Sequence, residues 1–156
     1  MSDDLAWRWT GFDGLSGHDV YDLLALRQRV FVVEQACAYL DADGRDASAM
    51  HLLARDARGA LLGCLRVLPP GGHFEVRAIG RVVTAPEARA LRLGHGLMRE
   101  ALARIEGEWG EIPLALAAQA HLTRFYAAHG FVAASEPYDE DGIPHIDMRR
   151  PVTRRG

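Results

Sequence analysis

A short segment rich in arginine and glycine, residues 89–96, joins a predicted strand to a predicted amphipathic helix. Free backbone N–H groups at a helix N-terminus, together with the helix dipole, can bind phosphate. Gly94 and Gly96 would let the backbone approach such a ligand closely, and Arg89 and Arg92 could reach its oxygens. The residue types therefore indicate a phosphate-binding turn. The alternative is an ordinary strand-to-helix turn whose arginines are solvated.

Two other groups of polar residues raise the question of a metal site. Asp41, Asp43 and Asp46 lie in an acidic loop, but a calcium loop needs glutamate at its twelfth position, which here is Leu52. The seven histidines show no H-x-x-x-H spacing beside an acidic partner, which argues against zinc. We expect no metal, and a solvated acidic loop that could attract a cationic acceptor.

Hydrophobic periodicity predicts the elements that must position these residues. Helices are expected from a cap at Asp19 onward, fraying at residues 32–35, and over residues 93–109 and 121–129. Strands are expected over residues 5–10, 51–55, 60–68, 74–84, 113–118, 131–134 and 143–148. Residues 136–142 read as an acidic loop and residues 149–156 as a frayed end. The mixed order predicts three layers rather than a regular doubly wound repeat.

Length and charge narrow the classes of function. The 156 residues fit one domain, with the 49% hydrophobic and 25% charged content of an ordinary globular protein. The net charge of -3 argues against nucleic acid as a partner. No apolar run approaches the ~20 residues of a membrane helix, and the acidic start does not resemble a signal peptide. Two cysteines without a disulfide or metal pattern fit a reducing compartment, so we expect a cytoplasmic protein, a monomer or homodimer.

An ordered set of motifs resembles the GNAT N-acetyltransferase superfamily. Arg89-x-x-Arg92-x-Gly94 resembles the family's R/Q-x-x-G-x-G/A loop, and residues 125–131 resemble its L/F-Y-x-x-x-G-F helix. Segments similar to the ElaA-like branch are residues 26–35, 79–82, 118–122 and 140–146. The resemblance implies an α+β fold with three α/β/α layers, in which helices flank a mixed, mostly antiparallel central sheet of about seven strands. It also implies a single domain over residues 1–150, followed by a basic C-terminal tail over residues 151–156.

The resemblance implies acetyl-CoA as the acyl-donor cosubstrate. The pyrophosphate would lie on the arginine- and glycine-rich loop, Gln119 would bond the pantetheine arm, and a backbone N–H in residues 82–84 would stabilise the oxyanion. The implied cofactor contacts are Val82, Val83, Thr84, Arg89, Ala90, Leu91, Arg92, Leu93, Gly94, His95, Gln119, His121 and Tyr126. Two positions depart from the family pattern: Arg92 replaces the usual first glycine, and Ala78 replaces the usual general-base glutamate.

The implied reaction is direct attack of a primary amine on the acetyl thioester. A lysine-like amine has a pKa near 10.4, so a base must first remove its proton. With Ala78 at the usual position, the candidate bases are Glu34, His121 and His145, while Tyr126 would protonate the departing thiolate. We take Tyr126, Glu34 and His145 as the candidate catalytic residues. Each also has a purely structural reading: a core aromatic, a solvated helix-terminal charge and a hydrogen-bonded structural histidine.

The expected partner is a small-molecule or peptide amine, with no nucleic acid and no membrane. Its identity is not predicted, because acceptor pockets on such folds are built from variable loops. The alternative function, favoured by the missing strand glutamate, is a non-catalytic acyl-CoA-binding module.

Overall fold

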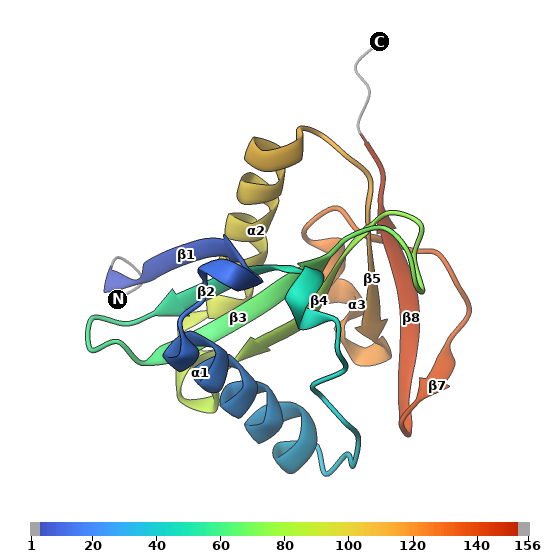
Figure 1. Ribbon diagram of the computed structural model, residues 1–156. Helices are drawn as coiled ribbons and strands as arrows, with labels where there is room; N and C mark the ends of the chain where they lie inside the picture. Colours follow the sequence, from blue (N-terminus) through green and yellow to red (C-terminus); the bar gives the residue numbers. More distant parts are fainter. Residues whose placement is uncertain (1–3, 153–156) are drawn as a thin grey trace.

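The computed structural model describes residues 4–152, which form one eight-stranded sheet with helices on both faces. The strand order is β1-β2-β3-β4-β5-β8-β6, and β7 pairs with β8. The strands are β1 (Ala6–Gly11), β2 (Met50–Arg55), β3 (Leu61–Leu68), β4 (Arg77–Thr84), β5 (Leu114–Gln119), β6 (Val132–Ala133), β7 (Tyr138–Glu140) and β8 (Ile143–Arg150). Figure 1 shows β1 at one edge of the sheet and the β7–β8 hairpin at the other. The expected mixed, mostly antiparallel sheet is confirmed, with β7 as an additional strand.

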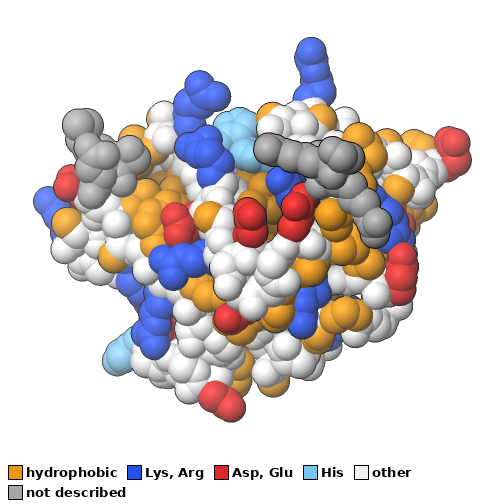
Figure 2. Space-filling view, turned by 90° about the horizontal axis from the view of Figure 1, so that it is seen from above, with side chains coloured by type: hydrophobic (Ala, Val, Ile, Leu, Met, Phe, Trp, Pro, Cys, Tyr) orange, Lys and Arg blue, Asp and Glu red, His pale blue; other side chains and the backbone are white. Residues whose placement is uncertain are grey.

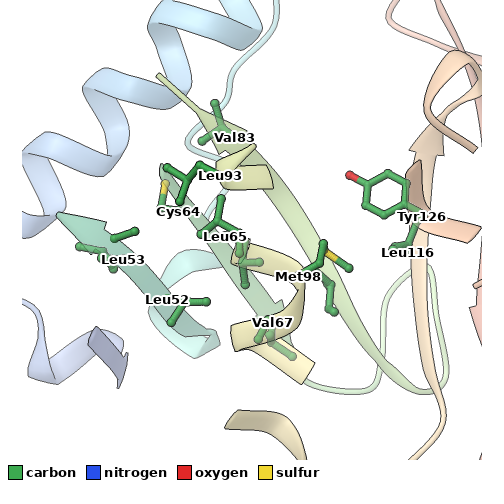
Figure 3. Close-up of a cluster of buried hydrophobic side chains, with 14 of the residues drawn as sticks. Leu52, Leu53, Cys64, Leu65, Val67, Val83, Leu93, Met98, Leu116 and Tyr126 are labelled. Atoms are coloured by element: carbon green, nitrogen blue, oxygen red, sulfur yellow. The ribbon is translucent and has the colours of Figure 1, made fainter. Parts of the chain in front are cut away.

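Successive residues of β3 point to opposite faces of the sheet, and a different helix covers each face. A Cβ at Gly63 would meet Leu93 and Leu97 of α2 (Leu93–Trp109), so this face of the sheet lies under α2. The neighbouring Cys64 lines a small space together with Leu23 of α1 (Gly17–Arg27), on the opposite face. Figure 3 shows part of the main apolar core that these layers enclose, including Leu65 and Met98. The expected three-layer arrangement follows from this alternation.

The first helix begins earlier than its predicted cap. Ser16 is the N-cap of α1: its hydroxyl accepts a hydrogen bond from the backbone N–H of Asp19, and the Asp19 carboxylate accepts one from the backbone N–H of Ser16. Asp19 is therefore the third helical residue of a capping box rather than the cap. The predicted fraying at residues 32–35 is also wrong, because α1 continues into a π-helical segment, η3 (Gln28–Glu34).

Other boundaries differ from the sequence prediction in ways that matter for the site. The helix over 93–109 is confirmed, but the predicted strand 74–84 begins only at Arg77. The predicted helix 121–129 is split into a 3-10 turn, η6 (Ala120–Leu122), and α3 (Thr123–Ala127). The predicted acidic loop 136–142 contains β7, and the predicted frayed end is wrong at residues 149–150, which belong to β8. Residues 153–156 lie outside the described part.

The acidic loop at residues 41–46 is not a solvated loop. Asp41 is only 3% exposed, and Arg27 donates to its carboxylate at 2.8 Å from the end of α1. Arg66 of β3 contacts Asp43 at 2.7 Å and Asp46 at 3.0 Å. The three carboxylates thus neutralise arginines from separate elements, because buried charges require partners. The ion pairs of the loop with Arg27 of α1 and Arg66 of β3 hold α1 against the sheet, so the loop does not form a free acidic surface.

A bulge bends β4 next to this loop. The pairing of β3 with β4 shifts register between Cys64 and Arg66, and Arg81 opposite the shift has a φ of 50°. The Arg81 side chain reaches the acidic loop, with its Nε 2.9 Å from Asp41 Oδ1. An extra residue in one strand increases local bending, so β4 turns away from its next neighbour beyond this point.

The surface and the helices carry further information on partners. Figure 2 shows one face of the molecule, on which arginine side chains lie among acidic ones rather than forming a continuous basic surface. Within residues 4–152, no helix is long and apolar enough to cross a membrane. In the same residues, no group of three or more His, Cys, Asp or Glu side chains is arranged to hold a metal ion.

Candidate active site

The central feature of the site is the divergence of two parallel strands. β4 and β5 are paired only at Arg77 with Leu114 and at Ala78 with Ala115. Beyond this pair, β4 continues to Thr84 and β5 to Gln119 without pairing to each other. The edge of β4 that faces β5 therefore leaves backbone groups without a strand partner over residues 82–84. Such groups can bind an extended ligand by hydrogen bonds.

The N-terminus of α2 follows β4 after one short segment and has no side-chain cap. A 3-10 segment, η5 (Pro86–Leu91), leads into the helix, and the N-cap residue Arg92 makes no side-chain hydrogen bond to the first amides of α2. Arg92 joins the two segments with a φ of 56°, a conformation that glycine adopts without cost. This positive φ explains why the family motif usually has glycine at the position of Arg92. Arginine at this position retains the backbone turn and exposes its side chain.

The predicted loop residues occupy the surface around these amides. Leu93 and Val83 are buried in the core, whereas Ala90, Leu91 and Arg92 are exposed. A pocket of about 960 Å³ lies beside the first turns of α2, between Arg92, His95 and Arg99 on one side and Trp7 and Arg58 on the other. The sequence indicated Arg92 and His95 as contacts but gave no sign that Trp7 and Arg58 lie opposite them.

Gly94 has a packing role at the start of α2. A Cβ at this position would lie 3.2 Å from the Phe125 ring of α3, closer than most real Cβ contacts. Glycine at position 94 thus lets Phe125 of α3 pack against the first turn of α2. This contact also fixes the position of Tyr126, which follows Phe125 in α3. His95 lies beside the same ring, with its Nδ1 2.8 Å from Nε2 of His129. Burial and the neighbouring His95 lower the pKa of His129.

Tyr126 lies on α3, 8% exposed, with its ring in the core beside Leu116. Figure 3 shows the hydroxyl pointing away from Leu116 toward the side where Val83 and Leu93 lie. Burial raises the pKa of Tyr126 to about 12, so the phenol is protonated at neutral pH. Within the described residues this hydroxyl makes no hydrogen bond, which leaves it available to a ligand.

The other predicted residues meet around the end of β5. Gln119, the last residue of β5, donates to the side-chain oxygen of Gln35 at 3.3 Å, directly after η3. Gln119 is also the register partner of His145 in β8. Gln35 was not singled out from the sequence, although it belongs to the 26–35 segment on which the family resemblance rests. The structure therefore brings the end of η3, Gln119 and His145 together, while His121 points to the surface and is exposed.

Glu34 lies at the end of η3 and forms an ion pair with Arg89 of the predicted phosphate-binding loop, residues 89–96, which is called the donor loop below. Arg89 Nη1 donates to Glu34 Oε2 at 3.0 Å, and Nη2 contacts the other carboxylate oxygen. These hydrogen bonds lower the pKa of the Glu34 carboxyl. Two residues predicted for different substrates, Arg89 for the pyrophosphate and Glu34 for the amine, are thus in direct contact.

His145 is oriented by its own strand. Its Nδ1 lies 2.7 Å from the carbonyl oxygen of Ile143, and its ring stacks on Tyr138. Because a carbonyl only accepts, Nδ1 carries the proton in the neutral ring, and Nε2 holds a free electron pair. Glu140 Oε2 lies 3.6 Å from that Nε2. The geometry suits proton acceptance at Nε2. Glu140 was not identified as a site residue from the sequence, where it belonged to the acidic loop 136–142 and to the 140–146 segment of the family resemblance.

Comparison with known proteins decides the family. Residues 25–151, most of the chain, match the acetyltransferase (GNAT) domain. The chain belongs to the GNAT acetyltransferase family. GNAT relatives of the ElaA-like branch are similar over nearly their whole length: protein ElaA of Escherichia coli is 39% identical over 150 residues, covering 95% of this chain and 97% of that protein. The UPF0039 protein sll0451 of Synechocystis is 39% identical over 145 residues, with 93% and 94% covered.

Solved GNAT structures show the same architecture. An acyl-CoA N-acyltransferase from Pseudomonas aeruginosa has a TM-score of 0.86 and 46% identity, covering 93% of this chain and 99% of that one. The crystal structure of E. coli ElaA also has a TM-score of 0.86, with 38% identity and coverage of 94% and 99%. The protein is therefore an acyltransferase with the GNAT fold.

Proposed function

We propose that the protein transfers an acetyl group from acetyl-CoA to a primary amine by direct attack. The observation that carries this proposal is the divergence of β4 from β5 beside the uncapped N-terminus of α2. Together they offer unpaired strand amides and helix amides to one extended ligand, as a pantetheine arm and its pyrophosphate require. The unoccupied Tyr126 hydroxyl on the adjacent helix supports the same placement.

The donor would lie along β4 and the start of α2. In this arrangement the backbone of Val82, Val83 and Thr84 holds the pantetheine arm and the thioester oxygen, with Gln119 on the opposite strand. The pyrophosphate lies over Ala90–Gly94, where Arg89 and Arg92 supply charge-assisted hydrogen bonds. Exposed His121 and half-buried His95 are proposed to contact the nucleotide end.

The reaction requires a proton acceptor for the amine and a hydrogen-bond donor for the leaving thiolate. The neutral amine attacks the thioester carbonyl, the C–N bond forms, and the C–S bond breaks as the tetrahedral oxyanion collapses. The amine proton passes to His145 Nε2 or to the Glu34 carboxylate, of which His145 has the free electron pair already in place. Tyr126 faces the leaving sulfur. Its pKa of about 12 exceeds the ~8.5 of an ordinary thiol, so hydrogen-bond donation to the thiolate is favoured over complete proton transfer.

The acceptor is proposed to be a small-molecule or peptide amine that enters near η3 and the β7–β8 hairpin. Cys37, shortly after η3, donates to the carbonyl oxygen of Asp141 in the hairpin turn at 3.3 Å, so these two segments enclose the approach to His145.

We further propose that residues 1–150 act as a single domain with residues 151–156 as a basic tail, and that the protein works in the cytoplasm with both cysteines reduced.

The test is thermal unfolding with acetyl-CoA, followed by turnover with a panel of amines. At a ligand concentration of 100 times the dissociation constant, a specific ligand raises the free energy of unfolding by about 2.7 kcal/mol. An unchanged melting temperature at saturating acetyl-CoA would contradict the donor assignment. Stabilisation without CoA release for any amine would favour the acyl-CoA-binding module.

A further inference from the structure

Two ion pairs connect η5, which leads into the donor loop, with η3, the segment that is proposed to border the acceptor. Arg29 and Glu34 lie in η3, and Glu87 and Arg89 lie in η5. Arg29 donates to both Glu87 oxygens at 2.9 and 3.3 Å, and Arg89 engages both Glu34 oxygens. The charges alternate, so that each segment contributes one cation and one anion. This pattern fixes the relative position of the two segments through two bidentate contacts.

The second of these pairs uses groups that both substrates need. A guanidinium that binds pyrophosphate presents the same paired N–H donors that it presents to a carboxylate. In the structure those donors of Arg89 are directed at Glu34, and the negative charge of Glu34 is neutralised in turn. Arg89 therefore has to release Glu34 before it can present its Nη1–Nη2 edge to a pyrophosphate. Glu34 becomes an unpaired carboxylate through the same exchange.

We propose that Glu34 is an internal competitor for the donor site: acyl-CoA displaces its carboxylate from Arg89, and the displaced carboxylate then faces the acceptor. This inference rests on the proposed function of the donor loop. It defines the acceptor class as an amine that arrives as a cation, because the group released beside it is an anion. An amine that is neutral in solution would gain nothing from the exchange. The contact thus couples binding of an anion at Arg89 to attraction of a cation at Glu34.

The surrounding structure permits the exchange without unfolding. The side chains of Arg89 and Glu34 are 47% and 41% exposed, so neither is left buried and uncompensated when the pair separates. The Arg29–Glu87 pair does not involve either residue and continues to hold η3 against η5. An exposed pair of this kind contributes little to stability, which limits the expected effect on donor affinity to about two- to fivefold.

Calorimetry with coenzyme A on the full-length protein tests the proposal. Glu34→Gln removes the competitor and should tighten coenzyme A binding by about two- to fivefold. Glu87→Gln is the matched control, because it removes the same charge two residues from Arg89 and leaves Arg89 paired with Glu34. Its affinity should stay close to that of the wild type. In an Arg89→Ala background, Glu34→Gln should no longer increase affinity.

A second measurement follows the carboxylate itself. In NMR titrations of the Glu34 side-chain carboxyl carbon, saturating coenzyme A should raise the pKa of Glu34 toward its ordinary value, although Arg29 remains nearby. Wild-type binding with no gain in Glu34→Gln, or an equal gain in Glu87→Gln, would overturn the competitor role alone. No binding of coenzyme A by the wild type would overturn the proposed function and this inference with it.

Discussion

The imidazole Nδ1 of His145 lies 2.7 Å from the carbonyl oxygen of Ile143, two residues earlier in the same strand. This contact assigns the proton of the neutral ring to Nδ1 and leaves Nε2 as the basic nitrogen. Tyr138 stacks on the ring and holds it in place, while the Tyr138 hydroxyl donates to Asp147 at 2.6 Å. A histidine held in this way by backbone and neighbours is prepared to accept a proton at one defined atom.

Replacing His145 should therefore lower turnover strongly. We expect His145→Ala to reduce kcat by about 10²- to 10⁴-fold, the usual contribution of a positioned base, with little change in acetyl-CoA affinity. Steady-state release of CoA with a reactive amine measures the effect. His18→Ala, at an exposed position on α1, is the control. If Glu34→Gln abolishes turnover while His145→Ala retains it, Glu34 is the base instead.

Tyr126→Phe should separate a role in leaving-group departure from a role in packing. The change keeps the ring and removes one hydroxyl, so we expect turnover to fall by roughly 10²-fold while acetyl-CoA affinity and melting temperature stay nearly constant. Tyr21→Phe, at a 75% exposed tyrosine, should change none of these. Full turnover in Tyr126→Phe would remove Tyr126 from the mechanism.

Gly94 should be sensitive to size because of Phe125. Gly94→Val would force the Phe125 ring to move, and with it the adjacent Tyr126, so both melting temperature and turnover should fall. Gly107→Ala in the same helix meets open space and should raise stability by up to about 1 kcal/mol. Adding Phe125→Leu to Gly94→Val should restore part of the loss. A Gly94→Val enzyme with unchanged melting temperature would contradict the packing role.

Arg92 and Arg89 should respond differently to substitution. Arg92→Gly removes the cost of a positive φ, about 1–2 kcal/mol, against a loss of chain entropy of about 0.5–1 kcal/mol, so stability should rise slightly. Acetyl-CoA affinity should be kept or improved. Arg92→Ala retains a Cβ and should not gain stability, which separates conformation from charge. Arg89→Ala should weaken acetyl-CoA binding, and calorimetry showing tighter binding by this variant would contradict its assignment.

The acidic loop should make the fold sensitive to acid. Hydrogen bonds from Arg66 hold the pKa of Asp43 well below its ordinary value, and Arg27 lowers that of Asp46 despite the opposing effect of burial. Carboxyls with depressed folded-state pKa values stabilise the fold above about pH 4, and this contribution is lost as the pH falls further. Asp43→Asn should cost about 1–3 kcal/mol at pH 7 and much less near pH 2. Urea unfolding at both pH values measures this, with exposed Asp13→Asn as the control.

Local signals in the sequence predicted much of the scaffold. The bounds of α2 follow from its apolar spacing, and the roles that the motif spacing gives to the donor loop and to Tyr126 stay predictions. The acidic loop was misread because its partners, Arg27, Arg66 and Arg81, come from three distant elements whose meeting no local pattern reveals. The short strand β7 was missed because its acidic residues read as loop, although β8 supplies the pairing that makes it a strand.

The candidate site was likewise predictable only in its local features and not in its long-range contacts. The residue types of Glu34, Gln119 and His145 could be selected from the sequence, but the ion pair of Glu34 with Arg89 spans 55 positions and depends on the π-helical turn of η3. The tautomer of His145 likewise depends on a backbone oxygen whose direction only the folded strand defines.

Because β4 and β5 pair at only two positions, the sheet consists of two parts, called plates here. Within the described sheet the plates pair with each other only along these two residue pairs, called the seam. One plate, β1–β4, leads into the donor loop, and the other, β5–β8, carries Gln119 and His145. A small rotation about the seam at Ala78 is magnified toward the open ends, where the thioester would lie. The reactive distances therefore depend on the bridges at those ends, Gln35 to Gln119 and Cys37 to Asp141, which join the helical side of the first plate to the second. Side chains that take no part in bond breaking would thus set the alignment of the proposed reaction.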